Sequence, residues 1–139
     1  MIPVFADTEY WIALNSPQDD LHPRTVAVTR SLKGRLILTS EVVLTEFLDG
    51  CAGRGDNSRR LAATFVRGLH EVDEVRILPQ TSGLFGDALA LYESRADKKW
   101  SMTDCASIVL CHQESIADVL THDYHFVQAG FRALLRPPN

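Results

Sequence analysis

The sequence predicts an α/β fold, a three-layer α/β/α sandwich with a central parallel sheet, formed by a single domain over residues 1–139. Short apolar, β-branched segments alternate with longer segments of helical periodicity, an order typical of a parallel sheet covered on both faces by helices. A chain of 139 residues can bury one core of ordinary size. Its 45% hydrophobic residues exclude disorder, and only 8 glycines and 6 prolines exclude a fibrous protein.

Five short apolar segments are predicted as strands. Pro3 is compatible with the first strand only because it lies near the beginning, and Pro79 closes the third. The predicted strands cover residues 2–6, 36–39, 75–78, 119–121 and 131–134.

Helices are predicted between these strands, at residues 23–33, 41–49, 58–70, 84–95 and 101–115. Gly34 and Gly50 are expected to end the first two helices, because glycine is the commonest residue just after a helix. Ser40 is expected to cap the second helix and Ser101 to open the last one.

Two of these helices have a clear apolar face. The third is expected to bury one stripe of residues spaced by four positions: Leu61, Phe65 and Leu69. The fourth carries an apolar face made of Leu84, Ala88, Leu91 and Tyr92.

Composition limits the functional classes. The chain has 14 Lys and Arg against 18 Asp and Glu, a net charge of −4, so it lacks the excess of positive charge usual in proteins that bind nucleic acid nonspecifically. No apolar run is long enough to span a membrane, and the N-terminal residues do not form a signal peptide. Three cysteines without CxxC spacing, Cys51, Cys105 and Cys111, favour free thiols in a reducing cytoplasm.

Four acids occupy positions where ligands collect in parallel sheets, beyond the carboxyl ends of the strands. Asp7 follows the first predicted strand, Glu46 lies on the helix after the second, Asp104 opens the last predicted helix and Asp123 follows the fourth strand. Each acid also has an ordinary structural explanation: Asp104, for example, could complete a Ser-x-x-Asp capping box with Ser101.

Glu46 is the most informative of the four because its apolar neighbours predict that its helix is largely buried. An unpaired carboxylate is costly in that environment, so an acid placed there requires a cation. Four carboxylates in one cleft would also raise one another's pKa values, and a divalent ion removes this repulsion. The prediction is one or two ions of Mg²⁺ or Mn²⁺, with hydroxyls that could orient the carboxylates or a bound water: Thr8, Thr103 and Thr121.

Four segments in chain order resemble the acidic motifs of PIN domains: residues 5–8 (FADT), 44–48 (LTEFL), 101–107 (SMTDCAS) and 120–131 (LTHDYHFVQAGF). The last, with its T-x-D-x-x-F pattern and following A-G-F, is the most specific. More narrowly, a short single PIN domain resembles the VapC-type toxins of bacterial and archaeal toxin–antitoxin pairs. Two departures are Glu9, an extra acid expected to border the site, and the absence of a further acid after Asp104.

The resemblance implies a central parallel sheet, metal-dependent ribonuclease activity, a homodimer and neutralisation by a small cognate antitoxin. By position, Asp7, Glu46, Asp104 and Asp123 become the acids that bind the metal and carry catalysis. Metal-activated water would then hydrolyse an RNA phosphodiester. The residues expected to hold RNA are Arg54, Arg59, Arg60, Lys98 and Lys99. Trp11 and Trp100 are interpreted as core residues.

Other interpretations are weaker. His122 and His125 form HxxH, but not with the helical i, i+4 spacing of a zinc site. A response-regulator receiver needs a late lysine, and none follows Lys99. A haloacid-dehalogenase-type phosphatase needs DxD after its first strand, which Asp7-Thr8-Glu9 does not supply. A histidine base with 2′-OH chemistry is the metal-free alternative. The remaining alternative is a catalytically silent or weakly active PIN-like domain that binds RNA or supports assembly.

Overall fold

The computed structural model describes residues 2–137, and its centre is a five-stranded sheet in which every pairing is parallel. The strands are β1 (Val4–Ala6), β2 (Ile37–Ser40), β3 (Val75–Leu78), β4 (Asp118–Leu120) and β5 (Arg132–Ala133). Their order in the sheet is β3-β2-β1-β4-β5. The α/β sandwich with a parallel sheet is therefore confirmed.

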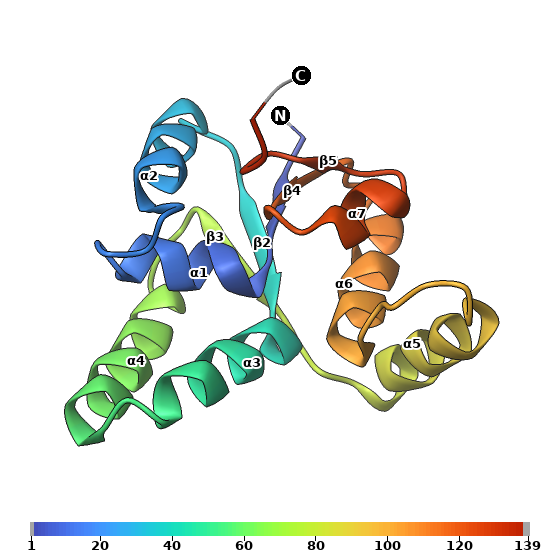
Figure 1. Cartoon of the computed structure of the whole chain (residues 1–139), viewed down its shortest axis with the longest axis horizontal. Helices are drawn as coiled ribbons and strands as arrows, with labels where there is room; N and C mark the ends of the chain where they lie inside the picture. The colour runs from blue at the N-terminus through green and yellow to red at the C-terminus, as the bar shows by residue number, and fades with distance from the viewer. Residues whose placement is uncertain (1, 138–139) are drawn as a thin grey trace.

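The strand order places the two halves of the chain on opposite sides of β1. β2 and β3 extend the sheet in one direction, and β4 and β5 extend it in the other. Figure 1 shows α1 to α4 on one side of the strands and α5 to α7 on the other. The strand order reverses between β1 and β4, and in open parallel sheets such a reversal leaves a crevice at the carboxyl ends of the strands.

The first helix, α1 (Thr8–Asn15), was not predicted. It begins directly after β1, with Asp7 at the N-cap position, and it buries Tyr10 and Trp11. The indole of Trp11 donates a hydrogen bond of 3.1 Å to Thr39, which in turn donates to the carbonyl of Ala6 at 2.9 Å. These bonds join α1 to the ends of β1 and β2, and they confirm that Trp11 belongs to the core.

The next three helices are α2 (His22–Ser31), α3 (Glu41–Ala52) and α4 (Asp56–Leu69). Ser40 caps α3 as predicted, because its hydroxyl accepts a hydrogen bond of 3.0 Å from the Val43 backbone. The predicted end at Gly50 was wrong: α3 continues to Ala52 and Gly53 follows it. α3 packs against both α4 and α1, and such tertiary packing can outweigh the low helix propensity of an internal glycine.

The predicted stripe on α4 was partly wrong. Leu69 is buried and Phe65 is half-buried, but Leu61 is 62% exposed. Ala62 occupies the buried position instead, so the face that packs is rotated by one residue. Leu61 lies at the edge of that face and lines a groove of about 500 Å³ between α1, α3 and α4.

The last helices are α5 (Ser82–Ser94), α6 (Met102–Gln113) and α7 (Tyr124–Gln128). On α5, Leu84 and Ala88 are buried as predicted, whereas Tyr92 is 50% exposed and leaves the expected apolar face. Trp100, just before α6, is buried and packs its ring under the guanidinium of Arg95. The short α7 was not predicted.

The core is continuous from β1 and β4 to the helices on both sides. Its largest fully buried side chains include Trp11, Tyr10, Phe5, Phe47 and Phe126. All three cysteines are free thiols, as expected. Within residues 2–137, no helix combines the length and apolar character needed to cross a lipid bilayer.

Candidate functional site

Asp7 lies at the point where the strand order reverses. It follows β1, its side chain is 6% exposed, and its backbone N–H donates to the Leu120 carbonyl at the end of β4, 3.3 Å away. The hydroxyl of Thr121 lies 3.0 Å from Asp7 Oδ2, although the two residues are 114 positions apart in the sequence. The carboxyl ends of β1 and β4 are therefore joined directly at this acid.

Thr121 connects three polar groups. Its Oγ1 lies 3.0 Å from Asp7 Oδ2 and 2.9 Å from Glu9 Oε1, and it accepts a hydrogen bond of 3.0 Å from the Asp123 backbone. A hydroxyl has one hydrogen, so it can donate to only one of the two carboxylates at a time. If it donates to Glu9, a protonated Asp7 can donate to it, and the hydroxyl then donates one hydrogen bond and accepts two.

The electrostatics of Asp7 agree with that arrangement. Burial is the main cause that raises the pKa of Asp7 from 3.8 to about 7. Hydrogen bonds from the Thr8 backbone and the Thr121 hydroxyl act against the shift, and the nearby carboxylates of Glu9 and Asp104 add to it. Asp7 and Asp104 are thus close enough to repel each other when both are ionised.

The carboxylates of Asp104 and Asp123 both lie next to the imidazole of His125. Asp104 is the third residue of α6, and its Oδ2 accepts a hydrogen bond of 3.0 Å from the Ser101 backbone in a capping box. Asp123 caps α7, where its Oδ1 accepts a hydrogen bond of 2.9 Å from the His125 backbone. The His125 imidazole Nδ1 lies 2.9 Å from Asp104 Oδ2 and 3.4 Å from Asp123 Oδ1.

The donor set fits a divalent cation. One ligand atom from each of Asp104, Asp123 and His125 lies within 4.8 Å of the others, close enough for all three to contact one ion. Oxygen donors of this kind suit Mg²⁺ and Mn²⁺. Thr8, next to Asp7, adds a second observation: its buried hydroxyl has no hydrogen-bond partner within residues 2–137, so a water or ligand oxygen would satisfy it.

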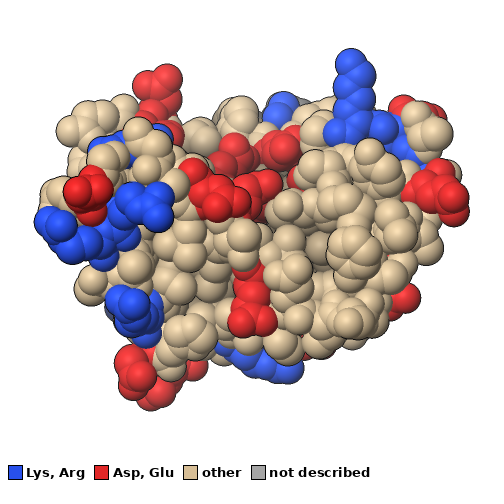
Figure 2. All heavy atoms as spheres, turned by 90° about the horizontal axis from the view of Figure 1, so that it is seen from below, with Lys and Arg blue, Asp and Glu red and all other residues tan. Residues whose placement is uncertain are grey.

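The surrounding surface carries charge of both signs. Figure 2, seen from below relative to Figure 1, shows acidic side chains gathered in a central hollow between two lobes. Lysine and arginine side chains lie at the outer margins of this face. A concentration of negative charge in a hollow attracts cations, and basic margins attract a polyanion.

The fold comparison identifies the architecture. A crystal structure of Mycobacterium tuberculosis VapC20, described as a Sarcin-Ricin loop cleaving toxin, is 26% identical and superposes with a TM-score of 0.83 over 96% of this chain and 99% of that one. VapC20 is a PIN-domain toxin. The chain has the PIN-domain fold.

Further structures with this PIN-domain fold belong to the FitAB pair, whose toxin is FitB. FitAB bound to an IR36 DNA fragment is 19% identical with a TM-score of 0.72, over 98% of each chain. FitAcB from Neisseria gonorrhoeae is 19% identical with a TM-score of 0.66, over 94% of this chain and 95% of that one. All these neighbours come from type II toxin–antitoxin systems. No protein-family model matches the sequence, and no curated protein sequence matches it.

The structure places Glu46 differently from expectation. The prediction that it is buried was wrong: Glu46 is exposed, whereas Val43, Leu44 and Phe47 form the buried face of α3. The rotation of 3.6 residues per turn places Glu46 outside that face. Its charge is therefore stable in water, and the argument that it requires a cation does not hold. Asp7, Asp104 and Asp123 are linked by contacts within residues 2–137, and Glu46 takes part in none of those contacts.

The predicted hydroxyls fall in different surroundings. Thr121 contacts Asp7 and Glu9 directly, and the unpaired hydroxyl of Thr8 lies beside Asp7 in the sequence. Thr103 instead lines a cavity of about 140 Å³ between α5 and α6, together with Phe85.

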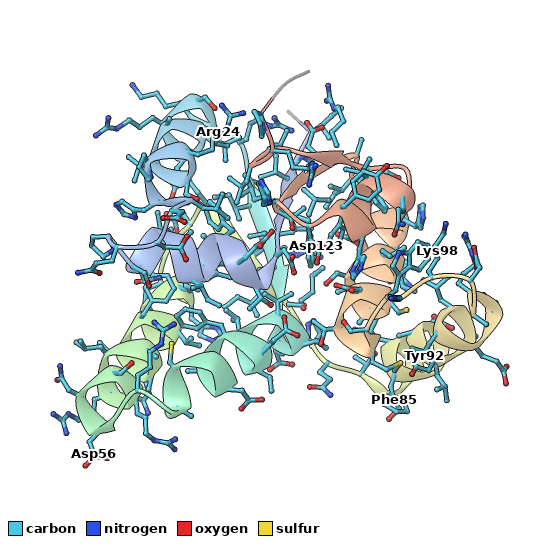
Figure 3. All side chains as sticks on the ribbon, in the orientation of Figure 1. Arg24, Asp56, Phe85, Tyr92, Lys98 and Asp123 are labelled. Atoms are coloured by element: carbon cyan, nitrogen blue, oxygen red, sulfur yellow. The ribbon has the colours of Figure 1, made fainter. Side chains whose placement is uncertain are left out.

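The basic residues predicted to hold RNA are all at the surface or half-buried, but they form two separate groups. Arg54, Arg59 and Arg60 belong to the turn between α3 and α4 and the start of α4. Figure 3 shows Asp56, at the start of α4, at an outer corner of the molecule and Asp123 near its centre. Lys98 and Lys99 precede α6, and Lys98 also lies 3.6 Å from the carboxylate of Asp97.

Sequence reasoning missed His125 as a member of the acid cluster. Glu9, in contrast, borders the site as expected: its Oε1 accepts hydrogen bonds from the Thr121 hydroxyl and the His122 backbone. The signal for His125 was its position two residues after Asp123, in a segment already assigned to the site. The cluster includes His125 but not His122, so the structure does not assemble an HxxH pair.

Proposed function

We propose that this PIN domain is a metal-dependent endoribonuclease, the toxin of a type II toxin–antitoxin pair, acting in the cytoplasm. The observation that carries the proposal is the convergence of Asp7, Asp104 and Asp123 at the carboxyl ends of β1 and β4. The likeness to VapC20, a Sarcin-Ricin loop cleaving toxin, supports RNA as the substrate class.

Asp7, Glu46, Asp104 and Asp123 would bind one or two ions of Mg²⁺ or Mn²⁺. Such an ion lowers the pKa of a bound water and neutralises charge on a phosphodiester. Thr121 would keep the carboxylate of Asp7 in position, because its hydroxyl contacts that carboxylate and its oxygen also accepts from the Asp123 backbone. Glu46, exposed on α3, would reach the site from the opposite side of β1.

The residues favour hydrolysis over attack by the RNA 2′-OH. An in-line attack by water on phosphorus would expel the 3′-oxygen and leave 5′-phosphate ends. Carboxylates that hold the ion can also orient the attacking water through hydrogen bonds. Products with 2′,3′-cyclic phosphate ends would instead indicate 2′-OH chemistry.

Basic side chains around the hollow would bind the RNA backbone. Lys98 and Lys99 are the candidates nearer the acids along the chain, and Arg54, Arg59 and Arg60 would contact RNA farther from the scissile bond. Trp100 is excluded as a stacking platform because it is 6% exposed.

Two protein partners belong to the proposal. A small antitoxin would inhibit the enzyme by inserting an arginine among the acids, since a guanidinium binds carboxylates in a bidentate geometry. A second copy of the chain would pack against α5, where three large apolar side chains on one face are exposed to solvent: Phe85, Leu89 and Tyr92.

The proposal is tested with purified protein and total or transfer RNA. We expect cleavage with Mg²⁺ or Mn²⁺, none with EDTA, and a loss of at least about 100-fold in the Asp7→Asn and Asp104→Asn variants. Asp49→Asn, at an exposed acid on the same helix as Glu46, is the matched control and should cleave normally.

Cleavage that survives EDTA would contradict the metal-dependent mechanism. Metal binding without cleavage of any RNA tested would favour the alternative, a silent PIN-like module that binds RNA or supports assembly. End-labelling of the products distinguishes 5′-phosphate from 5′-hydroxyl ends.

A further inference from the structure

The imidazole of His125 lies between the two carboxylates at the edge of the site. It is 31% exposed, whereas the side chain of Asp104 is 13% exposed. Its Nδ1, the ring nitrogen nearer the backbone, is the atom that faces both acids. A nitrogen donor in a group otherwise made of carboxylates changes which ions the group prefers.

The distances are those of neighbouring ligands on one ion. In an octahedral site with bonds of about 2.1 Å, two ligand atoms at right angles lie about 3.0 Å apart. Nδ1 of His125 lies 2.9 Å from Asp104 Oδ2 and 3.4 Å from Asp123 Oδ1. Each carboxylate oxygen therefore lies near the separation from Nδ1 that neighbouring ligands have, and one ligand atom from each of the three residues lies within 4.8 Å of the others.

The local fold holds the imidazole in this place. The His125 backbone donates to Asp123 Oδ1 at 2.9 Å, so the histidine and the acid are joined through the start of α7. The next residue, Phe126, is fully buried and packs edge-on against Phe131. On the other side, the Ser101 backbone fixes Asp104 Oδ2. Asp104 is thus held by the cap of α6, and Asp123 by the start of α7.

We propose that Nδ1 of His125 is a direct ligand of the divalent ion, together with Asp104 and Asp123, and that it makes the site prefer a transition-metal ion such as Mn²⁺ over Mg²⁺. The inference deepens the proposed function, since it concerns the same ion. Neutral imidazole with its hydrogen on Nε2 leaves the Nδ1 lone pair free for the ion.

The chemistry of the donor predicts the direction of the preference. Mg²⁺ is a hard ion that binds oxygen and retains its waters, whereas imidazole nitrogen is a common ligand of first-row transition ions. Along that row, affinity rises from Mn²⁺ to Co²⁺. Loss of the imidazole should consequently weaken the binding of Mn²⁺ and Co²⁺ far more than the binding of Mg²⁺.

The alternative is that His125 only positions Asp104 through a hydrogen bond. In that case, removing the imidazole would weaken the binding of Mg²⁺ and of Mn²⁺ by the same factor. A glutamine that can still donate a hydrogen bond would restore both affinities. The ratio of the two affinities therefore distinguishes a ligand from a positioning residue.

The first experiment is metal titration by calorimetry, with Mn²⁺ and Mg²⁺, on wild type, His125→Ala and His125→Gln. We expect wild type to bind Mn²⁺ at least about tenfold more tightly than Mg²⁺, and both variants to lose most of that preference. His122→Ala is the matched control, since His122 is a neighbouring histidine outside the cluster, and its preference should be unchanged. Thermal unfolding in EDTA checks that each variant is folded.

The second experiment observes the bond itself. Pulsed electron paramagnetic resonance of the Mn²⁺-loaded protein should show coupling to a nitrogen nucleus in wild type and in His122→Ala, but not in His125→Ala. Absence of nitrogen coupling in wild type, or equal losses of Mn²⁺ and Mg²⁺ affinity in the variants, would overturn the inference.

These failures are distinct from failure of the proposed function. If Mn²⁺ binds but its spectrum shows no nitrogen coupling, His125 is not a ligand. EDTA-sensitive cleavage would then still support the proposed metal-dependent function. Cleavage that resists EDTA removes metal dependence, whatever the spectroscopy of His125 shows.

Discussion

Asp7 is buried beside other carboxylates, and its carboxyl group is therefore more easily protonated in the folded chain than in the unfolded chain. Its pKa rises from 3.8 to about 7 on folding. Between these two values the folded state binds a proton that the unfolded state has released, so stability falls as the pH rises. The stabilising contribution of Asp7 is complete at pH values below the unfolded pKa, and it is lost as the pH rises through about 7.

We expect the metal-free protein to be more stable at pH 5 than at pH 8, by roughly 2–4 kcal/mol from this residue. Asp7→Asn cannot ionise, so it should lose most of this pH dependence and be more stable than wild type at pH 8. Denaturant unfolding in EDTA at both pH values measures the effect, with Asp49→Asn as the exposed control. An unchanged pH slope in Asp7→Asn would contradict the assignment.

Some residues of the candidate site could be predicted from the sequence, and others could not. The positions of Asp7, Asp104 and Asp123 at strand and helix ends could be predicted because each follows from the local pattern. The exposure of Glu46 could not, since neighbouring apolar residues indicate that a helix is buried without showing which side faces solvent. His125 could not be predicted as a neighbour of Asp104 because the contact joins α6 to α7 and depends on their packing.

At the scale of elements, the capping box of α6 stabilises the start of the helix and also fixes the carboxylate of Asp104. Ser101 Oγ accepts a hydrogen bond of 3.1 Å from the Asp104 backbone, and the Asp104 carboxylate accepts from the Ser101 backbone in return. The two interpretations of Asp104, as a capping residue and as an acid of the cluster, are thus compatible: the same oxygen, Oδ2, accepts the hydrogen bond of the cap and faces His125.

Ser101→Ala should lower the stability of the protein by about 1 kcal/mol, the usual value of an N-cap hydroxyl. Thr81→Ala is the matched control, because Thr81 caps α5 in the same way through the Leu84 backbone. Both variants should unfold earlier, but only Ser101→Ala should also weaken metal binding, by a few-fold. Equal metal affinities in the two variants would show that the α6 cap does not position Asp104.

The elements were predicted with uneven success for physical reasons. The strand β3 matches its prediction to the residue, because Pro79 ends it sharply. Helix α1 was missed because it is short and buried on most sides, at Thr8, Tyr10, Trp11 and Ala13, so it lacks the alternation of apolar and polar faces that identifies a surface helix. The five residues of α7 are too few for any periodicity.

At the scale of the whole molecule, a cluster of charges around the buried Asp118 joins the other end of the sheet. Asp118 begins β4, its side chain is 8% exposed, and it contacts Arg35 at 3.0 Å and Arg132 at 2.6 Å. Arg35 also donates to the Ile2 carbonyl at 2.9 Å. The cluster links the start of the chain to β4 and β5, at a distance along the strands from the functional acids.

Asp118→Ala should lower the stability by about 3 kcal/mol, because it leaves Arg35 partly buried without its carboxylate. Metal affinity should be unchanged at temperatures where the variant remains folded, since within residues 2–137 the Asp118 carboxylate pairs with Arg35 and Arg132 and with none of the proposed metal ligands. Chemical denaturation and metal titration of the same sample measure both. A variant as stable as wild type would show that the attraction within the ion pairs only offsets the free-energy cost of removing their charges from water.

The exposed face of α5 leads to a prediction about assembly. Phe85→Glu places a charge on the face that also contains Leu89 and Tyr92, and it should convert the proposed dimer to a monomer in analytical ultracentrifugation. Leu61→Glu is the matched control, since Leu61 is 62% exposed on α4. A wild-type chain that is monomeric at high micromolar concentration would contradict the dimer.

The order of the strands also determines when the site can exist during synthesis. Asp7 is synthesised 114 positions before Thr121, so the contact between them can form only after β4 has left the ribosome. Until then the nascent chain carries an incomplete set of acids. A message interrupted before β4 would yield fragments that lack Thr121 and Asp123, and the metal site of the proposed function could not form in them.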